Sequence, residues 1–123
     1  IVVESDEGGT IDLKKQVSRP FVDCARILAL ASGVGAVSTA ERLRAAGPRV
    51  RMSEDDVATA IDAFQFVQML RLRSQDGLDR GAGAAEANRI DPATLNSLDR
   101  RILREALRQA RKLQNRVALD YQL

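Results

Sequence analysis

Arginines set among apolar residues are the side chains of this sequence best suited to chemistry. Four of them stand within, or at the end of, an apolar helix-like stretch: Arg26, Arg42, Arg71 and Arg73. A guanidinium held at a domain surface can bind a phosphate through two parallel hydrogen bonds. The same groups can instead hold helices together by pairing with carboxylates. The candidate partners are Asp12, Asp23, Glu41 and Asp62. Residue types alone favour this structural interpretation and leave phosphate binding open.

A short charged run precedes the first long apolar segment and has the sequence Asp12-Leu13-Lys14-Lys15. The lysines can bind an acidic group that docks there, and Asp12 can pair with Lys14 or Arg26. The alternative is a connector whose charges are solvated. The residues alone favour the connector.

Arginine also recurs late in the chain at helical spacing, at Arg100, Arg104, Arg108 and Arg111. Such a stripe can follow a nucleic-acid backbone. No aromatic residue lies on it to stack bases, and Asp99 and Glu105 dilute its charge. We favour a solvated helix face, then docking on another domain of the same protein, and nucleic acid last.

The sequence excludes the common catalytic constellations. It has no histidine, no Gly-rich phosphate loop and no Asp-x-Asp motif for two magnesium ions. The adjacent Asp55 and Asp56 point in different directions on a helix, which indicates helix N-terminal charge. Cys24 is the only thiol, so we interpret it as a small buried hydrophobe in a reducing compartment. No run approaches 18 apolar residues, so we expect a cytoplasmic protein without membrane contact.

Composition favours one helical domain. The chain has 123 residues, of which 45% are hydrophobic and 29% charged, so it can bury one core. Only three Phe and one Tyr are present, so the core must be aliphatic, which suits helix-on-helix packing. The numbers of basic and acidic residues, 19 and 17, are nearly balanced, so the net charge of +2 does not indicate a polyanionic partner.

Four helices must position the arginines, and we predict an all-α antiparallel bundle. Pro20 suits a first helical turn, Ser38 begins a capping box, Ser53 precedes three acids, and Asn96 is a further cap. The predicted helices cover residues 20–32, 38–46, 53–75 and 96–119. The two long helices should form an antiparallel pair whose seam the shorter two cover. The buried stripe predicted for the last helix is Leu98, Ile102, Ala106, Ala110, Leu113 and Val117, with Leu103 and Leu107 at its flank.

The N-terminal segment is interpreted separately. Residues 1–3 are β-branched or aliphatic, residues 6–9 indicate a turn and residues 10–13 alternate, which predicts a short hairpin. We expect residues 1–15 to be an extended connector from a preceding domain and residues 16–123 to form the helical domain. The chain begins at Ile1 without Met, so we interpret it as part of a longer protein. Residues 77–87 indicate a mobile loop, and residues 88–91 lead into a turn at Pro92.

Six segments, taken in order, resemble the putative nucleotidyltransferase substrate-binding domain family. They are I-D-L-K-K at 11–15, R-P-F-V-D-C-A-R-I-L-A-L at 19–30, S-T-A-E-R-L at 38–43, A-F-Q-F-V-Q-M-L-R-L-R-S-Q at 63–75, N-R-I-D-P at 88–92 and L-N-S-L-D-R-R-I-L-R-E-A at 95–106. The resemblance covers about residues 10–117. The family usually has Ser-Pro where this chain has Asn96-Ser97, and Asn still caps a helix.

The resemblance implies a role in nucleotidyl transfer without catalysis by this domain alone. Such domains form the C-terminal helical part of bacterial signalling proteins with cyclic-nucleotide-binding-like, CBS and nucleotidyltransferase domains. The catalytic metal-binding carboxylates would lie in the preceding nucleotidyltransferase domain of the same chain, with Mg²⁺ and a nucleoside triphosphate as its cofactor and substrate. No catalytic or metal-binding residue is assigned to this fragment.

Seven positions of this chain match the family pattern. Those implied to contact nucleotide phosphate or the acceptor are Lys14, Arg26, Arg42, Arg71 and Arg73. Those implied to hold the shape of the site are Asp12 and Thr39.

A structural function is the alternative. The bundle would then be an interaction or dimerisation module that relays the state of a regulatory domain. Its apolar surface around Phe21, Leu28 and Leu30 would face another chain, in a homodimer for example.

Overall fold

The computed structural model describes residues 9–77 and 88–121, and it confirms the predicted all-α bundle. Four α-helices fall within the described residues, and the longer two supply half of the buried hydrophobic residues described. In chain order the elements are strand β1 (Ile11–Asp12), π-helix η2 (Lys14–Ser18), α1 (Arg19–Ser32), α2 (Thr39–Ala46), 3₁₀-helix η3 (Gly47–Val50), α3 (Glu54–Gly77), strand β2 (Arg89–Ile90), 3₁₀-helix η4 (Pro92–Thr94) and α5 (Ser97–Tyr121). No described helix is long and apolar enough to cross a membrane.

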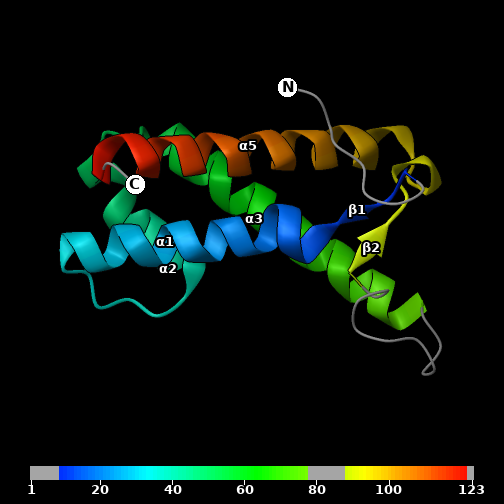
Figure 1. The fold of residues 1–123 in the computed structure, drawn as a ribbon, viewed down its shortest axis with the longest axis horizontal. Coiled ribbons are helices and arrows are strands. Elements are labelled where there is room, and N and C mark those ends of the chain that lie inside the picture. Colours follow the sequence, from blue (N-terminus) through cyan, green and yellow to red (C-terminus); the bar gives the residue numbers. More distant parts are fainter. Residues whose placement is uncertain (1–8, 78–87, 122–123) are drawn as a thin grey trace.

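The two long helices α3 and α5 run in opposite directions, as predicted, whereas α2 lies mainly on α1 rather than over the α3–α5 seam. α1 lies beside α5 and runs in the same direction, and α3 crosses behind both (Figure 1). α2 packs mainly on α1 and also on α3. The ribbon of β1 and β2 lies at one end of this arrangement, beyond the start of α1.

Local capping explains where the helices begin and end. The side-chain oxygens of Ser38, Ser53 and Asn96 each accept a hydrogen bond from the backbone N–H three residues later, at 3.1, 3.0 and 2.8 Å. These bonds satisfy N–H groups that have no helical partner, so the predicted starts of α2, α3 and α5 are confirmed. Gly33 ends α1 in the left-handed region with φ of 70°, as glycine allows.

The N-terminal segment departs from the prediction. Ile11 pairs with Ile90 and Asp12 with Arg89 in an antiparallel ribbon, so the partner of β1 comes from the stretch predicted as a turn. The hairpin predicted with residues 1–3 lies outside the described residues, as does the loop predicted at 77–87 except for Gly77, which is the last residue of α3.

The stretch predicted as a basic connector is helical instead. The carboxylate of Asp12 accepts a hydrogen bond from the backbone N–H of Lys15 at 2.9 Å, and its own N–H donates to Gln16 Oε1 at 2.9 Å. Asp12 therefore caps η2, which continues directly into α1. An aspartate before a helix is a capping signal that the sequence interpretation missed.

The core is aliphatic, as the composition predicts, with one aromatic pair between Phe21 and Phe64 at 5.7 Å between ring centroids. The stripe predicted for α5 is partly wrong, because Leu98 is 63% exposed whereas Leu103 is 1% exposed. At 3.6 residues per turn, Leu98 lies roughly 100° around the helix from the centre of the buried stripe.

The apolar surface predicted for docking is also wrong in its main members. Phe21 and Leu28 are fully buried in the core, and only Leu30 is exposed.

Candidate functional site

The seven positions predicted for a site do not form one cluster. Four of them belong to the end of the molecule that carries the β1–β2 ribbon: Asp12, Lys14, Arg71 and Arg73. Thr39 and Arg42 belong to α2, on the opposite half (Figure 1). Arg26 is exposed in the middle of α1 and has no hydrogen bond or ion pair with another described residue.

The residues of α2 have structural contacts. Arg42 Nε donates to the backbone oxygen of Ala36 at 2.9 Å and so closes the loop between α1 and α2. Thr39 is the half-buried first residue of α2, and the cap itself is Ser38.

Two residues at the ribbon end also have partners in the fold. Arg73 forms an ion pair with Asp99 at 3.3 Å, which joins the last turns of α3 to the first turn of α5. Asp12 is 8% exposed and caps η2, so the predicted pair with Lys14 or Arg26 is not formed.

Arg71 has three hydrogen bonds, all to neutral side-chain oxygens. Its Nε donates to Asn88 Oδ1 at 2.8 Å, and its Nη1 donates to Ser18 Oγ and Gln68 Oε1, both at 3.0 Å. Ser18 and Asn88 are 4% and 7% exposed. The guanidinium therefore joins α3, η2 and the residue before β2 and is held in one orientation.

One edge of this guanidinium remains open. The three hydrogen bonds use Nε and Nη1, and no described residue accepts from Nη2. No buried side-chain nitrogen or oxygen lacks a partner in the described part of the chain, so Nη2 is accessible to solvent. No described carboxylate forms an ion pair with Arg71. The positively charged guanidinium can therefore bind an anion by donating hydrogen bonds from its free N–H groups.

We call Arg71 and its three acceptors, Ser18, Gln68 and Asn88, the Arg71 clamp. The surrounding backbone holds these acceptors in place. Leu13 N–H donates to the backbone oxygen of Asn88 at 2.7 Å, which fixes Asn88 beside η2. The π-helical turn of η2 places Ser18 toward α3, and π-turns occur often at functional sites. Lys14 lies about one turn before Ser18, is exposed, and has no side-chain hydrogen bond or ion pair with another described residue. Of the predicted residues, Arg71 has an open edge, and Lys14 stands on the helical turn that precedes its partner Ser18.

Sequence reasoning missed the acceptors of this clamp. Ser18 and Asn88 lie 53 and 17 residues from Arg71, and no spacing rule connects residues at such separations. Gln68 lies three residues before Arg71 on α3. Helical spacing alone could therefore have predicted this contact.

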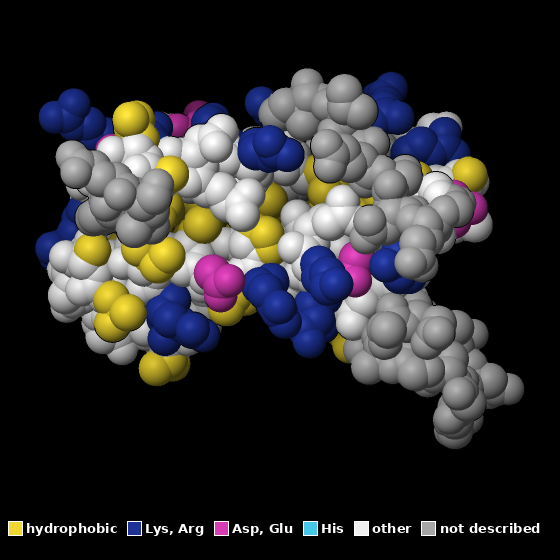
Figure 2. Space-filling model, in the orientation of Figure 1, with side chains coloured by type: hydrophobic (Ala, Val, Ile, Leu, Met, Phe, Trp, Pro, Cys, Tyr) yellow, Lys and Arg dark blue, Asp and Glu magenta, His cyan; other side chains and the backbone are white. Residues whose placement is uncertain are grey.

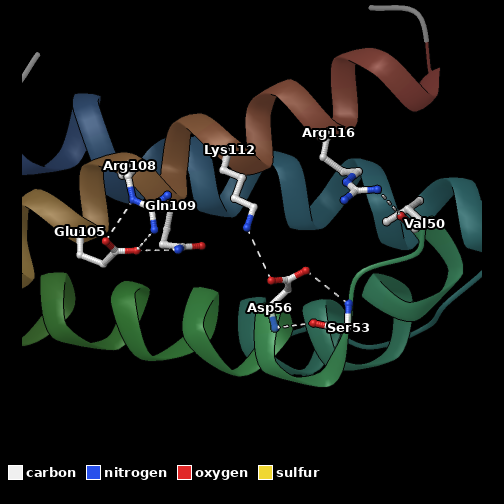
Figure 3. Close-up of polar contacts among 8 residues, drawn as sticks. All are labelled: Val50, Ser53, Asp56, Glu105, Arg108, Gln109, Lys112 and Arg116. Carbon is white, nitrogen blue, oxygen red and sulfur yellow. Dashed lines mark hydrogen bonds and ion pairs between the residues drawn. The ribbon is translucent and has the colours of Figure 1, made fainter. Parts of the chain in front are cut away.

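A second polar cluster lines the seam between α3 and α5 (Figure 3). Lys112 pairs with Asp56 at 3.5 Å, and Arg116 donates to the backbone oxygen of Val50 at 3.0 Å. The backbone N–H of Ser53, and then Lys112, lower the pKa of Asp56 below its ordinary range. The cavity beside this cluster has a volume of about 20 Å³, which suits one water molecule rather than a ligand.

Further along α5, Glu105 accepts from Arg108 at 2.6 Å and from Gln109 at 2.7 Å (Figure 3). The bond from Arg108 lowers the pKa of Glu105 and raises that of Arg108. Arg100 donates to the backbone oxygens of Pro92 and Leu95. Two of the four arginines in the predicted stripe are therefore committed to contacts within the chain.

Cys24 is buried and free, as predicted. Burial, and then the charge of Asp23, raise the pKa of its thiol to about 11. Within residues 9–77 and 88–121, no group of three or more His, Cys, Asp or Glu could hold a metal ion.

Comparison with known proteins gives one match. A family model described as "Putative nucleotidyltransferase substrate binding domain" matches residues 1–121. No curated protein and no solved structure matches the chain.

Proposed function

Because the chain belongs to the putative nucleotidyltransferase substrate binding domain family, we propose that it binds an anionic group of a nucleotidyl-transfer substrate at Arg71. The family description names both a nucleotidyltransferase and a substrate. The nucleotide in such a reaction carries phosphates, and phosphate oxygens accept hydrogen bonds from guanidinium groups. The acceptor of the nucleotidyl group, where it is acidic, offers the same chemistry.

The surroundings of Arg71 are the observation that carries this proposal. Arg73 has its charge paired with the carboxylate of Asp99, whereas no described carboxylate pairs with Arg71. Arg71 has neutral acceptors on two of its nitrogens and a solvent-accessible Nη2. A hydrogen bond to a charged group contributes roughly 1.5–3 kcal/mol, and a fixed guanidinium loses little freedom when an anion binds.

The other predicted contacts rank behind Arg71. Lys14 is exposed on the adjacent turn and supplies a second positive charge to the same surface. Arg42 and Arg73 already have partners within the fold. Arg26 lies outside this surface and stays a prediction.

The reaction itself is assigned to a nucleotidyltransferase domain that would associate with this one. There, catalytic carboxylates and Mg²⁺ would activate the transfer. The residues of this chain would then bind and orient the substrate. Fixed positive charge at Arg71 would stabilise phosphate oxygens without reorganisation.

A binding experiment tests the proposal. ATP, with and without Mg²⁺, would be titrated into the chain and into variants by calorimetry, at a temperature where circular dichroism shows each variant folded. Arg71→Ala should weaken binding roughly tenfold or more, and Lys14→Ala by a smaller factor. Arg101→Ala removes an exposed arginine of α5 and should leave binding unchanged. Equal affinity of the Arg71→Ala variant and the unchanged chain would overturn the assignment.

A second candidate function is an interaction module, which one observation favours. Three large apolar side chains are exposed on the half of the molecule away from the ribbon: Leu30 at 74%, Val37 at 79% and Leu119 at 77%. Figure 2 shows hydrophobic side chains gathered over the end of α1 on this half. Three side chains cover less than the roughly 800 Å² per partner of a standard interface, so this candidate ranks second.

Light scattering over a concentration series tests self-association through this surface. A homodimer that relays a regulatory state should dissociate in Leu30→Asp and persist in Leu98→Asp, whose side chain is exposed elsewhere. A monomer at every concentration would remove the homodimer.

A further inference from the structure

A groove between the start of α1 and the end of α5 has the features of a small-molecule site. Its volume is about 340 Å³, within the range of ligand pockets in proteins. It lies on the side of η2 and α1 that carries Lys15 and Arg19, about a quarter turn around the helix from Lys14 and Ser18. It is therefore a different surface from the Arg71 clamp.

The floor of the groove is apolar. Pro20, Cys24 and Ile27 line it from α1, and Val117 and Ala118 line it from α5. Cys24 adds no charge to this floor, because the raised pKa of its thiol keeps it neutral at ordinary pH. Hydrophobic side chains are visible between the two helices in Figure 2. Such a floor suits a flat hydrocarbon or heteroaromatic ring.

The rim carries two cations without partners. Lys15 and Arg19 are one helical turn apart and exposed, and neither side chain has a hydrogen bond or ion pair with another described residue. Lys and Arg side chains also gather over the start of α1 on the face shown in Figure 2. The carboxylate of Asp23 stands on α1 one helical turn after Arg19, and the amide of Gln114 lines the groove from α5.

We propose that this groove binds a small amphipathic organic anion, made of one or two fused rings and a single carboxylate, sulfonate or phosphate. The anionic group would lie between Lys15 and Arg19, and the rings would cover the apolar floor. Asp23 accepts hydrogen bonds and repels a second negative charge, so ring N–H donors are favoured and extended polyphosphates are disfavoured. The proposal stands on the groove and does not depend on the Arg71 assignment.

Fluorescence of 8-anilinonaphthalene-1-sulfonate tests it, because this probe has fused rings and one sulfonate. The folded chain should bind one equivalent, and 1-naphthoate and AMP should compete whereas inorganic phosphate should not. Competition by naphthoate alone would identify an aryl acid as the ligand class, and competition by AMP alone a nucleoside monophosphate. A wild-type chain that binds no probe while circular dichroism shows it folded would overturn the proposal.

Matched variants locate the probe. Ala118→Trp fills the groove and should weaken binding roughly tenfold or more. Ala58→Trp fills a groove of similar volume, about 360 Å³, between α2 and α3 and should have no effect. Arg19→Glu should weaken binding more than Arg101→Glu, which reverses a charge on an exposed face of α5. Equal affinity across either pair would overturn the assignment.

If Ala118→Trp fails to fold, the alkylation rate of Cys24 can locate the probe instead. Bound probe should slow alkylation of Cys24 in the unchanged chain, because the thiol lies on the floor. An unchanged alkylation rate at saturating probe would place the probe elsewhere. Arg71→Ala should keep probe binding, so failure of this proposal and failure of the nucleotide site are separate results.

Discussion

Arginine has four kinds of surroundings in this chain, and residue type does not separate them. Arg42 closes a loop by bonding a backbone oxygen, Arg73 pairs with a carboxylate, and Arg26 is solvated. Arg71 is held by neutral side chains with one edge open. The sequence favoured a structural role for each of them, and the contacts of Arg42 and Arg73 agree with that. Only the three-dimensional partners of Arg71 distinguish it as the candidate for binding.

The thiol of Cys24 gives a prediction at the residue scale. Burial raises its pKa from 9.0 to about 11, so the folded chain holds the thiol proton more tightly than the unfolded chain. The contribution of the protonated thiol to the free energy of unfolding is fully present below pH 9 and is lost as the pH rises through 11. Alkylation by iodoacetamide should therefore show a midpoint near pH 9 in urea and a far slower, higher-pH profile in the folded chain. A native profile with the urea midpoint would contradict the buried position.

At the scale of elements, local signals predicted the helices well, and distant pairings were missed. Ser38, Ser53 and Asn96 cap helices through bonds that span three residues, so the sequence alone predicts them. The pairing of β1 with β2 joins residues almost eighty positions apart, and Arg89 Nη1 donates to Thr10 Oγ1 across it. Each strand has two residues, which is too short for a period-2 pattern to be recognised.

The end of α1 gives a prediction with a matched control. Gly33 has φ of 70°, and an added Cβ would meet no atom within 4 Å, so strain comes from the backbone alone. Gly33→Ala should lower the free energy of unfolding by about 1 kcal/mol. Gly35 also has free space but no positive φ, so Gly35→Ala should be neutral or slightly stabilising. Urea denaturation measures both, and equal effects would contradict the left-handed end of α1.

The start of α3 gives a prediction on pH. The pKa of Asp56 is lowered first by the backbone N–H of Ser53 and then by Lys112. A lowered carboxyl pKa contributes stability above the unfolded value, and this contribution is lost as the pH falls through the folded value. As the pH is lowered past about 4, the melting temperature of the wild-type chain should therefore decrease, and that of Asp56→Asn should decrease less steeply. Asp55→Asn, one residue earlier and exposed, is the control and should keep the wild-type profile.

At the scale of the whole molecule, one aliphatic core is shared by all the helices. The prediction of an all-α bundle succeeded because composition and helical periodicity both report burial averaged over many residues. It failed at Leu98, which lies roughly 100° around α5 from the centre of the buried stripe. Helical periodicity therefore predicts that a buried face exists better than it predicts which residues lie at the edge of that face.

Two substitutions in α5 test the corrected core. Leu103 is 1% exposed, so Leu103→Ala should lower the free energy of unfolding by about 2–5 kcal/mol. Leu98 is 63% exposed, so Leu98→Ala should change it by less than about 0.5 kcal/mol. Thermal or urea unfolding measures the difference. A larger loss at Leu98 would restore the stripe predicted from sequence.

The Arg71 clamp also has a consequence for biosynthesis. Its acceptors come from η2, from α3 and from Asn88, which leaves the ribosome after both. A nascent chain that ends within α3 has the arginine but lacks the acceptor of its Nε. Long-range contacts of this kind form late, because the chain must first close a long loop. The proposed anion site would therefore be completed only when the last third of the domain docks. Its substrate would selectively stabilise finished domains over partly folded ones.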